Sequence, residues 1–75
     1  MKTEIIVRGY MVTVAWSDDD ATYIATVPRL AGCVSHGDSV EETVRNISEA
    51  MDLWLEAASR HEDSIPVPDG DGVTG

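Results

Sequence analysis

Apolar and polar residues alternate along two early segments of the chain, residues 11–16 and 22–27. Such an alternation, with a period of two, is typical of β-strands whose faces meet different surroundings. In the first segment one side carries Val12, Val14 and Trp16, and the other carries Met11, Thr13 and Ala15. In the second segment Tyr23, Ala25 and Val27 alternate with Thr22, Ile24 and Thr26. Both segments are therefore predicted to be strands with some apolar character on each side.

The residues around these two strands predict how they are connected. Residues 17–21 are rich in Asp and Ser, whose side chains bond the nearby backbone in turns, so they predict a hairpin loop. Upstream, residues 4–7 form a further extended segment, and Gly9 separates it from residues 11–16. Gly9 fits either a bulge or a bend. The pattern therefore allows one long interrupted strand or two short ones.

Residues 28–39 contain several breaks in a short space. Pro28 ends a strand because it cannot donate to a sheet ladder, and Gly32 and Gly37 mark sharp turns. Between the two glycines, residues 33–36 have the length of one short strand. Ser39 is then a typical helix N-cap, with Glu42 completing a capping box.

The helical signal that follows is the clearest in the chain, and it runs from residue 40 to about residue 60. Apolar residues recur there at spacings of three and four, at Val40, Val44, Ile47, Met51, Trp54, Leu55 and Ala58. About three strands and one helix predict a small α+β domain, with an antiparallel sheet covered on one face by the helix.

The C-terminal part of the chain gives weaker signals. Residues 63–68 are kept extended by Pro66 and Pro68, which is compatible with a short edge strand. We expect residues 1–68 to form the domain and residues 69–75 to form a flexible tail. One helix covers only one face of a sheet, and so small a domain is marginal alone. We therefore expect a homo-oligomer, a dimer or larger, or a partner protein over the other face.

Charge narrows the kind of partner. The chain of 75 residues has 14 acidic and 5 basic residues and a net charge of −9. Direct nucleic-acid binding requires clusters of Lys and Arg, so this composition argues against it. Acidity suits a basic partner, whose approach it would accelerate, although it also serves simply to keep a small protein soluble. The sequence shows neither a signal peptide nor a long apolar run, so we expect a cytoplasmic protein without membrane contact.

Residues with catalytic or ligand-binding chemistry are few and scattered. Cys33 has no adjacent base or cation, which favours a buried side chain over a nucleophile. His36 has only Asp38 nearby, and His61 follows the helix, where a cation suits the macrodipole. Asp18, Asp19 and Asp20 lack the alternating spacing of a calcium loop, and the acidic and glycine residues at 69–72 lack its other ligands. We expect no catalytic residue, metal or cofactor.

The two tryptophans have different expected roles. Trp54 lies on the apolar side of the helix, which favours packing in the core. Trp16 ends a strand beside the acidic hairpin loop, where an aromatic side chain is a good anchor for a partner. The candidate partner-binding residues are therefore Trp16, Asp18, Asp19 and Asp20.

Residues 28–50 contain the pattern P-x-L-x-G-C-V-x-x-G-D-S-x-E-E-x-x-x-N-I-x-E-A. This pattern resembles the HicB-like antitoxin family, and the resemblance extends over about residues 10–68. Ala31 stands where the family usually has a second proline, and Ala21-Thr22 replaces a usual glycine. Both are local changes at turns.

The resemblance implies a function and a fold. HicB-like proteins neutralise HicA, a small basic toxin that cleaves mRNA, by masking its RNA-binding surface. Their N-terminal domain resembles a trimmed, degenerate ribonuclease H fold without catalytic carboxylates. Relatives often carry a C-terminal DNA-binding domain, which we do not expect in this chain. We thus expect a non-enzymatic antitoxin with a HicA-like partner.

Two other functions stay open. A HicB-like domain without a toxin would be a homo-oligomeric interaction protein. A residual ribonuclease H-type nuclease would need inward carboxylates for two Mg²⁺ ions, and residues 5–7, 11–16 and 22–27 contain no Asp or Glu.

Overall fold

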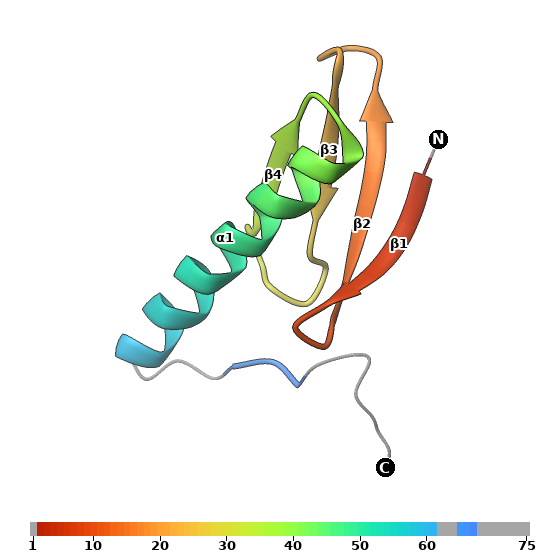
Figure 1. Ribbon diagram of the computed structural model, residues 1–75. Helices are drawn as coiled ribbons and strands as arrows, with labels where there is room; N and C mark the ends of the chain where they lie inside the picture. The colour runs from red at the N-terminus through yellow and green to blue at the C-terminus, as the bar shows by residue number, and fades with distance from the viewer. Residues whose placement is uncertain (1, 62–64, 68–75) are drawn as a thin grey trace.

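The computed structural model describes residues 2–61 and 65–67. It contains a four-stranded antiparallel sheet and one helix, and the helix crosses a single face of the sheet (Figure 1). The elements are β1 (Lys2–Val7), β2 (Tyr10–Ser17), β3 (Thr22–Thr26), β4 (Val34–Gly37) and α1 (Val40–Arg60). The strands lie side by side in chain order. The predicted α+β arrangement is confirmed.

The sheet has one strand more than the three expected, because the first extended segment is two strands. Residues Arg8 and Gly9 have φ angles of 52° and 84° and connect β1 to β2 directly. Two consecutive positive φ angles are the signature of a type I′ hairpin turn, whose twist matches that of the strands. Val7 pairs with Tyr10 on either side of this turn. Gly9 therefore belongs to a turn between two strands, and a bulge in one strand is excluded.

The short segment between β3 and β4 folds into a compact loop. Leu30 N donates to Val27 O, Cys33 N to Leu30 O, and Val27 N to Cys33 O, all at 2.9–3.1 Å. Leu30 is fully buried, and the Trp54 indole N–H donates to Ala31 O at 2.9 Å. This tryptophan packs against the core, as expected. The loop includes Cys33, so β4 begins one residue later than the sequence predicted.

Helix α1 has the predicted bounds and the predicted N-cap. The Glu42 backbone N–H donates to Ser39 Oγ at 3.0 Å. The Glu42 carboxylate accepts in return from the Asp38 N–H at 2.7 Å, one residue before the cap itself. The capping box is thus formed in a slightly extended version, which also fixes the chain that leads into the helix.

The core lies between α1 and one face of the sheet. Its buried residues are Tyr10, Val12, Val14, Ala25, Val27, Leu30, Cys33, Ile47 and Met51. Thr43, the one buried polar residue of the described chain, donates its hydroxyl to Ser39 O at 2.6 Å. The parity that sequence alternation assigned to β2 and β3 is therefore confirmed, since Val12, Val14 and Ala25 all face the helix.

Three contacts tie the remaining parts of the chain to this core. Arg8, in the first turn, forms a bidentate ion pair with Asp52 of α1 at 2.7 and 2.9 Å. Tyr10 Oη donates to Pro66 O at 2.5 Å, and Arg29 donates to Val67 O at 3.2 Å. Residues 65–67 are not in a strand, so the edge strand expected over residues 63–68 is wrong for these three. Residues 63, 64 and 68 and the expected tail, 69–75, lie outside the described residues.

Candidate protein-interaction surface

The sheet face opposite α1 carries no secondary-structure element among the described residues, and we call it the open face. It is formed by the strand residues that alternate with the core positions, namely Lys2, Glu4, Ile6, Met11, Thr13, Ala15, Thr22, Ile24, Thr26, Val34 and His36. Ile6 is 56% exposed and Val34 is 54% exposed. The open face is therefore a mixed surface with apolar side chains available for contact.

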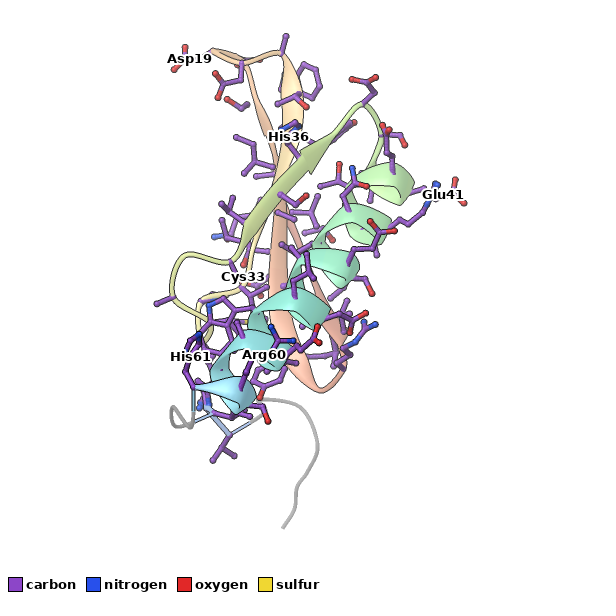
Figure 2. All side chains as sticks on the ribbon, turned by 90° about the vertical axis from the view of Figure 1, so that its left-hand side faces the viewer. Asp19, Cys33, His36, Glu41, Arg60 and His61 are labelled. Carbon is purple, nitrogen blue, oxygen red and sulfur yellow. The ribbon has the colours of Figure 1, made fainter. Side chains whose placement is uncertain are left out.

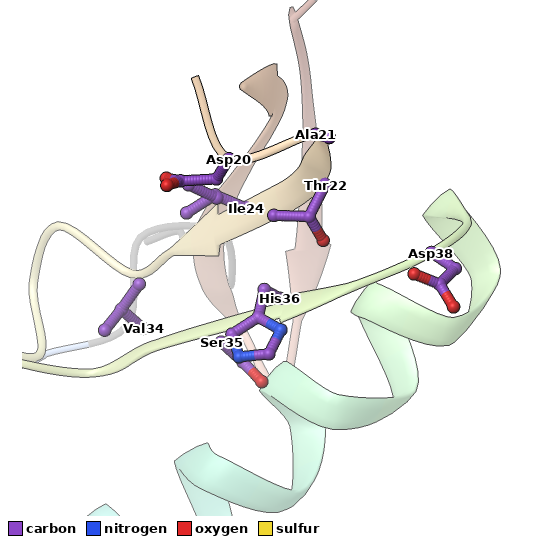
Figure 3. Close-up of a pocket in the computed structure, with 8 residues that line it drawn as sticks. All are labelled: Asp20, Ala21, Thr22, Ile24, Val34, Ser35, His36 and Asp38. Carbon is purple, nitrogen blue, oxygen red and sulfur yellow. The ribbon is translucent and has the colours of Figure 1, made fainter. Parts of the chain in front are cut away.

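A hollow of about 580 Å³ lies on this face, at the end of the sheet where β3 and β4 pair (Figure 3). It is lined by Asp20, Ala21, Thr22, Ile24, Val34, Ser35, His36 and Asp38. The apolar side chains come from the two strands, and the carboxylates come from loops at their ends, Asp20 before β3 and Asp38 after β4. The hollow thus combines an apolar surface with two acidic groups.

The hairpin loop after β2 separates the four residues expected to bind a partner. The Trp16 indole N–H donates to Asp18 Oδ1 at 2.8 Å, and its ring meets the Tyr23 ring edge-on, with centroids 5.0 Å apart. Trp16 belongs to the same side of β2 as the core residues, whereas Asp20 borders the hollow on the open face. Asp19 lies at the tip, as Figure 2 shows. The structure therefore divides these residues between two surfaces.

Ser17 holds the hairpin loop in shape. Its hydroxyl donates to Asp20 Oδ2 and accepts from the Asp20 backbone N–H, both at 3.3 Å. Ala21 has a φ of 52°, the left-handed conformation that glycine adopts most readily. The Ser17 hydroxyl thus positions both the backbone and the carboxylate of Asp20.

The residues with catalytic potential are apart from one another. His36 lies on β4, Cys33 in the loop before it and His61 beyond the other end of α1 (Figure 2). Cys33 is buried, as expected, and burial raises the pKa of its thiol, which disfavours the reactive thiolate. Over residues 2–61 and 65–67, no three His, Cys, Asp or Glu side chains are placed to hold a metal ion.

Sequence reasoning missed several residues of the hollow. Thr22, Ile24 and Val34 were assigned only to strands, and Asp38 was considered only as a neighbour of His36. A signal was present, because Ile24 and Val34 have the parity opposite to the core residues of their strands. What was not visible in the sequence is that the loops on both sides bring carboxylates to the same end of the sheet.

A small α+β domain with one covered and one open sheet face is a suitable scaffold for protein binding. Sequence comparison gives its family: the profile of the HicB-like antitoxins of bacterial toxin–antitoxin systems matches residues 10–70. The chain belongs to this family, and the resemblance found in its motif is confirmed. Membership of an antitoxin family favours a non-enzymatic role.

Individual relatives agree with the family match. A UPF0150 protein of Thermoplasma acidophilum is 33% identical over 57 residues, covering 76% of this chain and 83% of the relative. A UPF0150 protein of Synechocystis is 39% identical over 44 residues, covering 59% of this chain and 60% of the relative. One of Helicobacter pylori is 57% identical over 37 residues, about half of each chain. The matched region therefore spans less than two thirds of some relatives.

No solved structure matches the chain, so the likeness to a degenerate ribonuclease H fold stays a prediction. Within the described residues, α1 is not apolar enough along its length to cross a membrane.

Proposed function

We propose that this protein is an antitoxin that binds a small basic toxin of the HicA type and masks its RNA-binding surface. The observation that carries the proposal is the match of residues 10–70 to the HicB-like antitoxin family. This range contains β2, β3, β4 and α1, and therefore both the covered core and the hollow. In this proposal the protein acts by occupying the toxin and has no chemistry of its own.

The charge distribution supports a basic partner. The chain has a net charge of −9, and three consecutive aspartates stand at the hairpin tip. An RNA-binding surface is rich in Lys and Arg because it must contact phosphates. An acidic surface competes for the same cations and accelerates the encounter at low salt. We assign the first contact to Asp18, Asp19 and Asp20, with Trp16 as an apolar anchor at the same end of the sheet.

The decisive experiment is to look for a short basic reading frame beside the gene and to measure binding of this protein to its product. In stopped-flow measurements, association should be fast at low salt and slower as ionic strength rises, because exposed charges are screened beyond roughly 10 Å at 0.1 M salt. Changing Asp18, Asp19 and Asp20 to Asn should slow association more than it speeds dissociation. Trp16→Ala should mainly speed dissociation.

A matched control separates contact from overall charge. Changing Glu41, Glu49 and Glu56 to Gln removes the same three charges from the exposed face of α1, whose start Figure 2 marks with Glu41. If both triple variants slow association equally, only net charge matters and the tip is not the contact. The antitoxin proposal itself fails if the wild-type protein neither binds the neighbouring toxin nor protects RNA from it.

A second candidate function is self-association without a toxin. The exposed Ile6 and Val34 on the open face favour it, since covering them with a second copy would remove apolar surface from water. Two chains that each carry a charge of −9 repel one another, so this association should strengthen with salt. Light scattering at low and high salt tests it, and a monomer at high concentration under both conditions would exclude it.

A further inference from the structure

The hollow at the end of β3 and β4 has a composition that the masking proposal does not yet use. We infer that it receives a cationic side chain, arginine or lysine, from the protein that covers the open face. This inference rests on the proposed function, because it assumes a basic protein partner. It adds a defined subsite to a surface that otherwise attracts the partner only through overall charge.

The lining of the hollow matches both parts of such a side chain. Ile24 and Val34 offer apolar surface to the methylene stem that lysine and arginine share. Asp20 and Asp38 offer carboxylate oxygens, which accept hydrogen bonds from an ammonium or guanidinium group. None of the residues that line the hollow is a Lys or Arg. An anionic group is therefore disfavoured there, and a neutral one would leave both carboxylates unused.

The two acidic residues are held by separate parts of the fold. Asp20 is positioned through Ser17, whose hydroxyl both donates to its carboxylate and accepts from its backbone N–H. Asp38 is positioned through its own N–H, which donates to the Glu42 carboxylate of the capping box. The hairpin loop thus holds the Asp20 carboxylate, and the capping box holds the backbone of Asp38, beside the hollow without needing a ligand to order them. Such preorganisation lowers the entropy lost on binding.

The open shape of the hollow indicates that the cation is delivered by a larger molecule. Sites for free small molecules bury most of the ligand surface, roughly 70–90% of it, in a deep cleft. This hollow lies on the surface of a two-layer domain, and its lining residues Ile24, Val34 and His36, drawn in Figure 3, also belong to the open face. A free cation there would stay largely hydrated. A side chain carried by a protein is dehydrated by the surrounding interface, which strengthens its charged hydrogen bonds.

A second copy of this chain is a poorer source of that cation than a basic protein. Arg8 is engaged by Asp52, and Arg60 is engaged by Glu56 at 2.8 Å within α1. Arg29 donates to Val67 O. Using any of these three would first break an existing contact. Lys2 and Arg45 are the other two cations, but a chain with 5 basic and 14 acidic residues repels a second copy of itself, whereas a basic partner brings cations in excess.

The direct test uses acetyl-arginine amide and acetyl-lysine amide as probes, with acetyl-citrulline amide as the neutral control. In amide NMR titrations, the cationic probes should give weak, saturable shifts concentrated at residues 20–24 and 34–38. The double variant Asp20→Asn and Asp38→Asn should weaken this binding about tenfold or more, since it removes both charge-assisted acceptors. The matched double variant Glu41→Gln and Glu49→Gln should leave it unchanged.

A second variant tests shape separately from charge. Val34→Phe places a larger side chain at an exposed position beside the hollow, so the fold should persist while the space is reduced. It should abolish the localised shifts although both carboxylates remain. Shifts spread over the whole acidic surface, equal shifts with the citrulline probe, or equal losses in the two double variants would overturn the inference.

Binding to the toxin distinguishes failure of this inference from failure of the proposed function. Normal toxin affinity in the hollow variants means that the protein is an antitoxin whose partner binds elsewhere, and it refutes the subsite. If the probes bind at the hollow but the protein does not bind the toxin, the cation subsite is supported and the toxin is refuted as its partner. Unlabelled protein can also be titrated into labelled protein. Shift changes at the same residues of the hollow would show that a second copy donates the cation, which also refutes a basic partner.

Discussion

The two faces of the sheet are built from the same strands but have opposite environments. Val12, Val14 and Ala25 are fully buried beneath α1, while Ile6 and Val34 on the other face are more than half exposed. Both faces contain β-branched and other apolar residues, so hydrophobicity alone does not distinguish them. The difference is that the covered face is packed by one helix and one loop, and the open face is available to another molecule.

This contrast separates stability from binding within a very small domain. On the covered face each side chain is fixed by its neighbours, so substitutions there should affect folding. On the open face and at the hairpin tip, substitutions should leave folding nearly unchanged and affect only the partner. The following experiments test this division, beginning with the largest expected effect.

The strongest contrast is expected between two isoleucines. Ile47 of α1 is fully buried, so Ile47→Ala should lower the free energy of unfolding by about 2–5 kcal/mol. Ile6→Ala on the open face should cost less than about 1 kcal/mol, because most of that side chain is already in water. Urea denaturation followed by circular dichroism gives both values. If Ile47→Ala does not fold, Ile47→Val, with an expected cost of about 0.5–1.5 kcal/mol, replaces it. Equal costs for Ile6 and Ile47 would mean that the open face is also part of the core.

Gly37 tests how closely β4 approaches the start of α1. A Cβ atom at Gly37 would lie 2.7 Å from Thr43 Oγ1 and 2.8 Å from Thr43 N, so Gly37→Ala must displace the helix backbone. We expect a loss of about 1–3 kcal/mol, typical of overpacking. The control is Gly32→Ala, which meets no atom within 4 Å but has a φ of +80° and so suffers backbone strain alone. A smaller loss of unfolding free energy for Gly37→Ala than for Gly32→Ala would show that the first turn of α1 moves at little cost.

The reaction rates of thiols at two neighbouring positions, 33 and 34, compare the buried and the exposed environment directly. Cys33 is 6% exposed and should react slowly with a thiol reagent, at a rate limited by opening of the fold. A cysteine at the next residue, introduced by Val34→Cys together with Cys33→Ala, should react at least about tenfold faster, since an opening cost of 1.4 kcal/mol already gives that factor. Similar rates would indicate that the loop before β4 opens readily.

The same thiol predicts a modest dependence of stability on pH. Burial raises the Cys33 pKa above its ordinary value of 9.0, so the folded protein holds this proton more tightly than the unfolded chain. Its contribution to stability is complete below pH 9.0 and declines as pH rises through the unfolded pKa towards the folded one. Unfolding curves of wild type and Cys33→Ala between pH 8 and 11 should diverge in this direction. Parallel curves would show that the thiol is not desolvated.

The smallest effect is expected at the hairpin tip. Changing Asp18, Asp19 and Asp20 to Asn should alter the free energy of unfolding by no more than about 0.5 kcal/mol, because the loop is exposed. Asn can still accept the Trp16 and Ser17 hydrogen bonds through its amide oxygen. A large loss of stability would mean that the tip is structural, and its effect on toxin binding would need another explanation.

The sequence alone predicted most of the local structure. Its apolar spacing and the capping pair of Ser39 and Glu42 predicted α1 from its first residue to its last, because both signals arise within a few residues of chain. The alternation in β2 and β3 predicted which residues share a face. For the link between β1 and β2 it left two structures open, since Gly9 allows either, and only the pairing of Val7 with Tyr10 decides between them.

The tertiary structure decided which face the helix covers and what the candidate surface contains. The alternation of residues along a strand assigns them to two faces of the sheet. Because Ile24 and Ala25 lie on opposite faces and are both apolar, the sequence does not show which face is the core. Likewise Trp16 and Asp20 are close in sequence, yet Trp16 packs against Tyr23 on the covered side of the sheet, while Asp20 borders the hollow. Asp38 joins Asp20 there only because β4 pairs with β3. Contacts between distant parts of the chain depend on how the layers pack, which local sequence patterns do not specify.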